Sequence, residues 1–163
     1  MSEYRVEKRR EPAQLTLVKR ALASVPAALQ HGAFIGCAGT GRIASAARAD
    51  YAAAAAAVLI RSGQAGRVYE LAGDTAYTLA ELAEALSQAS GKAIPYVDLP
   101  QHEYEAALAG AGLPQPVAAL LADSDAGAAR GGLFDDGHQL SNLIGRPTTP
   151  LAQLLAEAMA RSA

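Results

Sequence analysis

Apolar residues recur at helical spacing soon after the start of the chain. The segment 21–31 carries an apolar face and is followed by Gly32, a residue type that commonly ends helices. An alanine-rich segment, 51–60, predicts a second helix. Asp50 precedes it and is the expected N-cap, because a short carboxylate accepts from unpaired backbone N–H groups and favours the positive end of the helix dipole.

A further helix is predicted to begin after Thr78. Thr78 and Glu81 have the spacing of a capping box, in which each side chain bonds the backbone N–H of the other residue. The leucines that follow share one face, and Gly91 is the expected end. The rest of the chain predicts further helices at roughly 100–110, 115–122, 136–143 and 150–161.

Short apolar runs predict strands at 33–35, 42–45, 67–71 and 94–97. Pro95 has no N–H to donate to a ladder, so the last run is expected at a sheet edge. Few strands among many helices, in this order, predict an α/β protein. The order is typical of the second half of such a protein.

Three glycines lie between the first two predicted strands: Gly36, Gly39 and Gly41. In a dinucleotide-binding loop the glycines follow a strand and open a helix directly, so that the pyrophosphate sits on the helix N-terminus. Here the segment 42–49 separates Gly41 from Asp50. The spacing therefore favours a turn between strands, with a nucleotide loop as the alternative.

Length and composition narrow the class of protein. A chain of 163 residues is expected to form one domain with a real core. The sequence has no apolar run of about 18 residues, so no membrane span is expected. It also shows no apolar leader, so secretion is not expected. The single cysteine, Cys37, excludes an internal disulfide and suits the reducing cytoplasm, which is the expected location.

Charge is distributed unevenly along the chain. Residues 1–20 hold six of the 14 basic residues and three of the 16 acidic ones, which leaves 8 basic and 13 acidic residues in 21–163. The body is therefore mildly acidic, and no nucleic-acid face is expected. We interpret 1–20 as a solvated, poorly ordered basic terminus, with a nucleic-acid or membrane arm as the alternative.

Candidate catalytic and metal-binding patterns are weak. The histidines and Cys37 do not have zinc spacing, so no metal is expected. Tyr4 and Lys8 have the spacing of the proton-transfer pair of short-chain dehydrogenases, but they lie in the charged terminal run, and we interpret the match as coincidence. One residue of the pair Asp135 and Asp136 is expected to cap the helix that begins near 137.

Two arginines, Arg48 and Arg130, have two interpretations. Either guanidinium could clamp an anionic substrate or a cofactor phosphate, and either could form a structural ion pair. Arg48 is the better placed of the two for a ligand, because it stands beside a predicted helix start.

Three longer segments, 23–59, 66–92 and 121–151, together resemble one family. The last is the most specific, with Leu-Phe-Asp-Asp followed by Leu-Ile-Gly-Arg-Pro-Thr-Thr-Pro-Leu. They resemble the C-terminal half of the NmrA-like, atypical short-chain dehydrogenases, and within that group the bacterial NAD(P)H:quinone oxidoreductases. The resemblance covers 21–163, which we interpret as a partial domain of this type, whereas 1–20 does not resemble the family.

This resemblance implies the C-terminal part of an extended Rossmann-type fold, with few strands plus a helical substrate lobe over a cleft at 94–163. In the family, the N-terminal half holds NADPH, and hydride passes from the nicotinamide to a quinone. That half, with its Gly-x-x-Gly-x-x-Gly loop, has no counterpart here, and 14–20 does not match the family stretch that lines the active site.

No catalytic residue of the family can therefore be carried over. By position, Phe34, Ile35, Arg48 and Phe134 are expected to face the substrate cleft. The resemblance implies a truncated NAD(P)H:quinone oxidoreductase that is inactive as an isolated chain. The alternative is a dinucleotide-sensing or protein-binding module without catalysis. An exposed sheet edge also predicts self-association.

Overall fold

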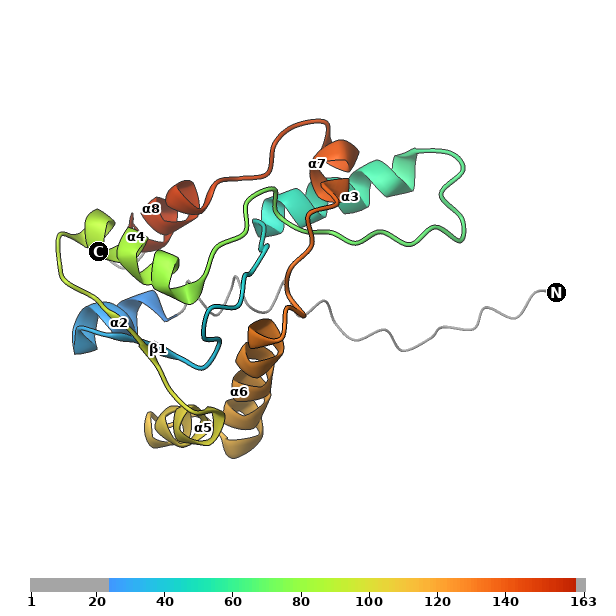
Figure 1. Cartoon of the computed structure of the whole chain (residues 1–163). Coiled ribbons are helices and arrows are strands. Elements are labelled where there is room, and N and C mark those ends of the chain that lie inside the picture. Colours follow the sequence, from blue (N-terminus) through green and yellow to red (C-terminus); the bar gives the residue numbers. More distant parts are fainter. Residues whose placement is uncertain (1–23, 161–163) are drawn as a thin grey trace.

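The computed structural model describes residues 24–160, and the expectations for 1–20, including the Tyr4 and Lys8 pair, lie outside that range. The elements are α2 (Val25–His31), β1 (Phe34–Gly36), α3 (Arg48–Ile60), α4 (Leu79–Ser90), β2 (Tyr96–Asp98), α5 (Gln101–Gly110), α6 (Gln115–Ala129), α7 (Gln139–Ile144) and α8 (Leu151–Ala160). In Figure 1, α5 and α6 lie together on one side, α3 and α7 on another, and α4 lies near α8. The predicted α/β class is confirmed, with helices predominant and a small parallel sheet.

The sheet consists of β1 and β2, which are parallel and paired Phe34 with Tyr96 and Ile35 with Val97. Because side chains alternate along a strand, Phe34 enters the core while Ile35 and Val97 share the open face. The prediction of strands at 33–35 and 94–97 is therefore confirmed, although both strands begin and end later than predicted. Pro95 lies just before β2, where its carbonyl accepts from Phe34 N at 2.9 Å.

The prediction of a strand at 42–45 is wrong. Ile43 forms an isolated antiparallel bridge with Tyr77. The next residue bonds elsewhere: Ala44 N donates to Leu133 O at 2.9 Å, and Ala44 O accepts from Gly73 N at 2.9 Å. Because successive residues pair with different segments, no continuous ladder forms.

The prediction of a strand at 67–71 is also wrong, since these residues pair with no strand among the described residues. Tyr69 and Leu71 pack partly against α3 and α7, while Val68 is 54% exposed. Buried and exposed side chains therefore alternate as in a strand, but the described residues provide no neighbouring strand.

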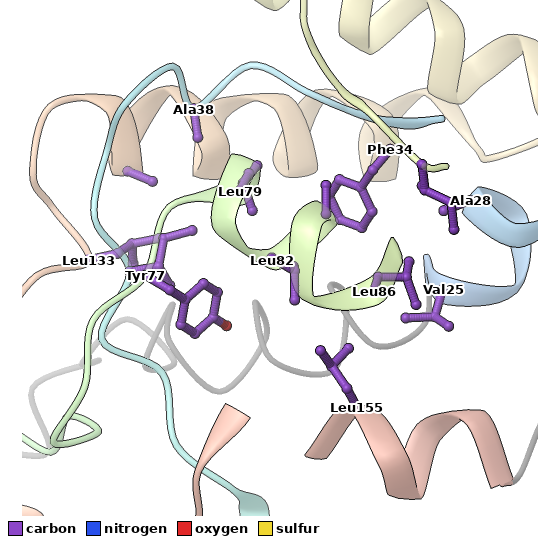
Figure 2. Packing of buried hydrophobic residues seen from close by; sticks show 14 residues of the cluster. Val25, Ala28, Phe34, Ala38, Tyr77, Leu79, Leu82, Leu86, Leu133 and Leu155 are labelled. Carbon is purple, nitrogen blue, oxygen red and sulfur yellow. The ribbon is translucent and has the colours of Figure 1, made fainter. Parts of the chain in front are cut away.

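The main core forms around α4. Leu79, Leu82 and Leu86 of α4 meet Val25 of α2 and Leu155 of α8, as Figure 2 shows. Burying such side chains contributes about 1.5–3 kcal/mol each to folding. The predicted apolar face of this helix is therefore confirmed, and it lies at the centre of the main core.

Local signals at helix ends are largely confirmed. Thr78 Oγ1 accepts from Glu81 N at 3.1 Å, and Thr78 N donates to Glu81 Oε2 at 2.7 Å, which completes the capping box. Gly32 and Gly91 end their helices at φ values of 72° and 67°, in the left-handed region that favours glycine.

Two capping predictions are wrong. Helix α3 begins at Arg48 with Ala47 as its N-cap, so Asp50 lies inside the first turn. The helix near 137 begins at Gln139, with His138 as N-cap, and its N-cap makes no side-chain capping bond. Asp135 instead accepts from Gly137 N at 3.0 Å, two residues along the chain.

Helix α6 is longer than predicted, because it continues to Ala129 instead of stopping at 122. The sequence that follows 122 contains aspartate, serine and glycine, which favour helix ends over helix interiors. Asp125 is nevertheless buried within the helix and accepts from Cys37 N at 3.2 Å. A tertiary contact therefore overrides the local preference.

Candidate functional site

The site is built on the loop 145–150, which belongs to the segment that most resembles the family. Asp50, whose side chain is completely buried, accepts from Arg146 Nη2 at 2.6 Å and from Thr149 N at 2.8 Å. A buried carboxylate is costly unless it is paired and hydrogen-bonded, and both conditions are met here. Asp50 thus fixes the loop against the first turn of α3.

Asp74 holds the other side of the same loop. Its carboxylate accepts from Thr148 N at 2.8 Å, from Ser141 Oγ at 2.7 Å and from Thr148 Oγ1 at 3.2 Å, and it lies 3.0 Å from His138 Nδ1. In return, Asp74 N donates to Thr148 Oγ1 at 2.9 Å. Two carboxylates therefore set the path of 145–150.

These contacts also set the charge of Asp74. Burial acts to raise the pKa of its carboxyl, but the hydrogen bonds from Ser141, Thr148 and His138 outweigh burial and lower the pKa to about 2. Asp74 is therefore an acceptor in its ionised form at neutral pH. It is not a proton donor.

A pocket of about 170 Å³ opens beside Asp74 and the loop 145–150. Its lining residues are Ser45, Asp74, Thr75, Tyr77, Pro147, Thr148, Thr149, Pro150, Leu151 and Leu154. Ser45 Oγ and Tyr77 OH, both on buried residues, lie 2.5 Å apart. Burial raises the pKa of Tyr77, and the bond to Ser45 offsets this only in part, so the phenol is protonated at neutral pH. The pocket offers hydroxyl groups and an apolar wall, and Asp74 adds the one carboxylate among these lining residues.

Backbone N–H groups of the glycine turn at 36–41 already donate hydrogen bonds to protein side chains. Cys37 N donates to Asp125 Oδ2 at 3.2 Å, Ala38 N to Tyr96 OH at 3.2 Å, and Gly39 N to Asp98 Oδ1 at 2.9 Å. A phosphate placed here would have to displace these acceptors and would meet two carboxylates. The loop therefore does not fit a dinucleotide pyrophosphate; it is a turn, as predicted, although it follows β1 without leading into a second strand.

Close packing explains the last of the three glycines. A Cβ atom on Gly41 would lie 2.3 Å from the carbonyl oxygen of Ala128, at the end of α6. Gly41 is thus required for the approach of two backbones, which is a structural role.

The predicted cleft residues do not line the pocket. Phe34 lies in the main core, and Ile35 lies on the open face of the sheet. Arg48 is exposed at the start of α3. Phe134 is 44% exposed, and the Arg42 guanidinium carbon lies 5.8 Å from its ring centroid. Their contact with substrate stays a prediction.

Sequence reasoning missed Asp74 and the pairing of Asp50 with Arg146. The available signal was the loop 145–150 itself, which is rich in donors and follows a short helix. Its acceptors lie far away in the sequence, at separations of 74 residues for Asp74 with Thr148 and 96 for Asp50 with Arg146. Only the folded chain brings them together.

Residues 24–160 contain no group of three or more histidine, cysteine, aspartate or glutamate side chains that could hold a metal ion. Within the same range, no helix is both long enough and apolar enough to cross a membrane. Cys37 is buried, and its Sγ donates to Ala122 O at 3.4 Å.

No protein-family model matches the chain. It is 60% identical over 132 residues to quinone oxidoreductase 2 of Escherichia coli, a match that covers 81% of this chain and 46% of that protein. The crystal structure of the NADPH-dependent quinone oxidoreductase from E. coli in complex with NADPH superposes with a TM-score of 0.85 at 56% identity, over 87% of this chain and 50% of that one. The chain is a homologue of the C-terminal half of these proteins.

More distant structures have the same fold. Triphenylmethane reductase of Citrobacter sp. in complex with NADP(H) is 31% identical, with a TM-score of 0.78, and the match covers 83% of this chain and 47% of the reductase. A nucleoside-diphosphate-sugar epimerase of Staphylococcus aureus is 28% identical, with a TM-score of 0.76, over 85% and 48% of the two chains. The predicted resemblance to NmrA-like oxidoreductases is therefore confirmed, and the chain spans about half the length of the relatives it matches.

Proposed function

We propose that this chain is the substrate-side half of an NADPH-dependent quinone oxidoreductase, which transfers hydride from NADPH to a quinone. The observation that carries the proposal is the 60% identity over 132 residues to E. coli quinone oxidoreductase 2. The superposition on the crystal structure of the NADPH-dependent quinone oxidoreductase of E. coli agrees with it. In such enzymes the cofactor supplies the redox chemistry, and the protein positions the reacting groups.

The described residues do not provide a cradle for the cofactor at the glycine turn, where Asp98, Asp125 and Tyr96 occupy the amides. We therefore propose that the isolated chain is inactive, and that activity requires a nucleotide-binding half such as the one the relatives carry. This chain then contributes the walls of the substrate cleft.

Within this proposal, Ile35, Phe134 and Arg48 make the contacts with the quinone. Ile35 is 37% exposed and Phe134 44% exposed, so both offer apolar surface to a ring. Arg48 offers an exposed cation for a polar substituent. Phe34 is buried in the core and supports the sheet on which Ile35 lies.

The experiment has two parts, performed on the purified 163-residue chain. Thermal unfolding with and without NADPH measures binding, since a ligand at 100 times its dissociation constant adds about 2.7 kcal/mol of stability. The loss of NADPH absorbance in the presence of a soluble quinone measures turnover. We expect neither a shift nor turnover from the chain alone. Binding without turnover would favour the dinucleotide-sensing module, and turnover would overturn the proposed requirement for a second half.

Two further expectations accompany the proposal. We infer a cytoplasmic location, because the single buried thiol of Cys37 and an NADPH-dependent reaction suit a reducing compartment. We also propose that the chain alone self-associates through the edges of the sheet formed by β1 and β2, since open ladders invite pairing. Light scattering over a range of concentrations tests this, and a constant monomer mass would contradict it.

A further inference from the structure

The pocket beside Asp74 and the loop 145–150 does not include the residues proposed to contact the quinone. Ile35, Arg48 and Phe134 are absent from its lining, which comes from 45, 74–77 and 147–154. These segments all belong to this chain, so a ligand of the pocket is bound by the chain itself. The pocket is therefore a second candidate site, and its occupant has to be inferred from its own chemistry.

Buried residues form the floor of the pocket, and exposed residues form its rim. Ser45, Tyr77 and Leu154 are buried, whereas Thr75 and Pro150 are exposed. The volume is about 170 Å³, and an apolar cavity of about 150 Å³ is enough to bind benzene. The pocket therefore has room for a single ring.

The hydroxyl groups at the floor keep a hydrogen that no acceptor takes. Ser45 Oγ and Tyr77 OH lie 2.5 Å apart, so one of them donates to the other. Within residues 24–160 this is the one hydrogen bond that either hydroxyl makes. Because each hydroxyl carries one hydrogen, the pair has one O–H left to donate to a ligand.

Tyr51 adds a third hydroxyl next to this pair. Its oxygen is buried and has no hydrogen-bond partner among the described residues. Burial raises the pKa of Tyr51 to about 12, the backbone of Ala46 opposes the rise, and Tyr77 adds to it, so Tyr51 lies close to Tyr77. A buried donor without an acceptor is unfavourable. This part of the protein therefore favours a ligand that brings an acceptor.

Asp74 determines the charge that the pocket tolerates. It is the one carboxylate among the lining residues, and its pKa of about 2 keeps it ionised at neutral pH. Its oxygens already accept from Ser141 and Thr148, so it does not require a cation from a ligand. A second negative charge nearby would be repelled. The pocket therefore excludes anions and suits a neutral ligand.

We propose that this pocket binds a neutral single-ring molecule that carries a hydrogen-bond-accepting oxygen, of the class of aryl ketones. The ring lies against the apolar wall that includes Leu151 and Leu154, and the oxygen accepts from the hydroxyl pair of Ser45 and Tyr77. Binding uses residues of this chain, so it requires neither NADPH nor a second half, and it does not rest on the proposed function.

The test is an NMR titration of the full 163-residue chain without NADPH, in which the amides of Tyr77, Thr148 and Thr149 report binding. The probe is acetophenone. We expect saturable shifts at these amides, with a dissociation constant of about 1 mM for so small a ligand.

Two further probes separate the hydrogen bond from the charge. α-Methylstyrene has nearly the shape of acetophenone, with a CH₂ group in place of the carbonyl oxygen. We expect it to bind about fivefold more weakly, because it cannot accept a hydrogen bond. Benzoate has a similar size but is an anion, and we expect it to bind at least about tenfold more weakly than acetophenone, because Asp74 repels it.

A matched pair of variants locates the hydrogen bond. Ser45→Ala combined with Tyr77→Phe removes both hydroxyls that line the pocket, and we expect this variant to bind acetophenone and α-methylstyrene equally. Tyr96→Phe removes a hydroxyl outside the pocket, which donates to Asp98, and we expect it to keep the fivefold preference for acetophenone.

Three results on the native chain would overturn the proposal, and they remain decisive if the double variant does not fold. The first is the absence of saturable shifts at Tyr77, Thr148 and Thr149. The second is equal affinity for acetophenone and α-methylstyrene, and the third is binding of benzoate as tight as that of acetophenone. In a folded double variant, a preference for acetophenone that survives the loss of both hydroxyls would overturn it as well.

Discussion

Asp74 links segments that are far apart in the sequence, since it accepts from Ser141 on α7 and from Thr148 in the loop 145–150. Asparagine at this position has nearly the same shape but is neutral, and its NH₂ group would face one set of these donors. We expect Asp74→Asn to lower the free energy of unfolding by about 2 kcal/mol, because hydrogen bonds to charged groups are worth about 1.5–3 kcal/mol each. Urea denaturation measures the change.

The control for this substitution is Asp123→Asn, at an exposed aspartate of α6. Surface changes of this kind fall within about 0.5 kcal/mol. If both variants lost the same stability, the effect would come from net charge and not from the hydrogen bonds that Asp74 accepts.

The lowered pKa of Asp74 also predicts a pH dependence. The folded-state pKa of about 2 lies below the ordinary value of 3.8, so the native state favours the ionised carboxylate. The stability that Asp74 contributes is present above pH 3.8 and is lost as pH falls toward about 2. We expect the difference in unfolding free energy between the native chain and Asp74→Asn to shrink over this range, as urea titrations at each pH will show. A difference that is constant with pH would contradict this assignment.

At the scale of elements, the contact between the glycine turn and the end of α6 is a tight one. A methyl group at position 41 would lie 2.3 Å from Ala128 O, so one backbone must move. We expect Gly41→Ala to destabilise the fold by about 1–3 kcal/mol, measured as a lower urea midpoint.

Gly127→Ala is the matched control, since it lies within α6 and a Cβ atom there meets nothing within 4 Å. Alanine favours helices over glycine, so we expect this variant to be stabilised by up to about 1 kcal/mol. If Gly41→Ala were as well tolerated as Gly127→Ala, the close backbone approach would not be a constraint.

Elements specified by local sequence could be predicted. The capping box of Thr78 and Glu81 and the glycines that follow α2 and α4 depend on atoms a few residues apart, and all were predicted correctly. The extent of α6 was not, because the buried contact of Asp125 with Cys37 N joins residues 88 positions apart. Local preference alone ended the helix too early.

Strands and site residues depend still more on distant partners. Residues 67–71 have the composition and alternation of a strand, but a strand also requires a neighbour, which the described residues do not provide. Asp50 was predicted as the N-cap of the helix that follows it, but it lies inside the first turn of α3. Its role required knowledge that the loop 145–150 returns to it.

At the scale of the whole molecule, a continuous core is bordered by surface that exposes apolar side chains. The buried cluster around α4 is continuous from α2 to α8, whereas Ile35 and Val97 on the open face of the sheet and Val68 between α3 and α4 are exposed. The chain matches about half the length of its relatives. Under the proposed function, the chain folds around its own core, and quinone reduction requires a nucleotide-binding half.

The most direct test of this account is reconstitution of activity. NADPH oxidation with a soluble quinone is measured for this chain alone, for the unmatched N-terminal portion of E. coli quinone oxidoreductase 2 alone, and for the two co-purified. The account predicts quinone-dependent NADPH oxidation by the complex and none by either half. Activity of this chain alone would contradict it. A complex of the two halves that leaves NADPH unoxidised in the presence of quinone would contradict it as well.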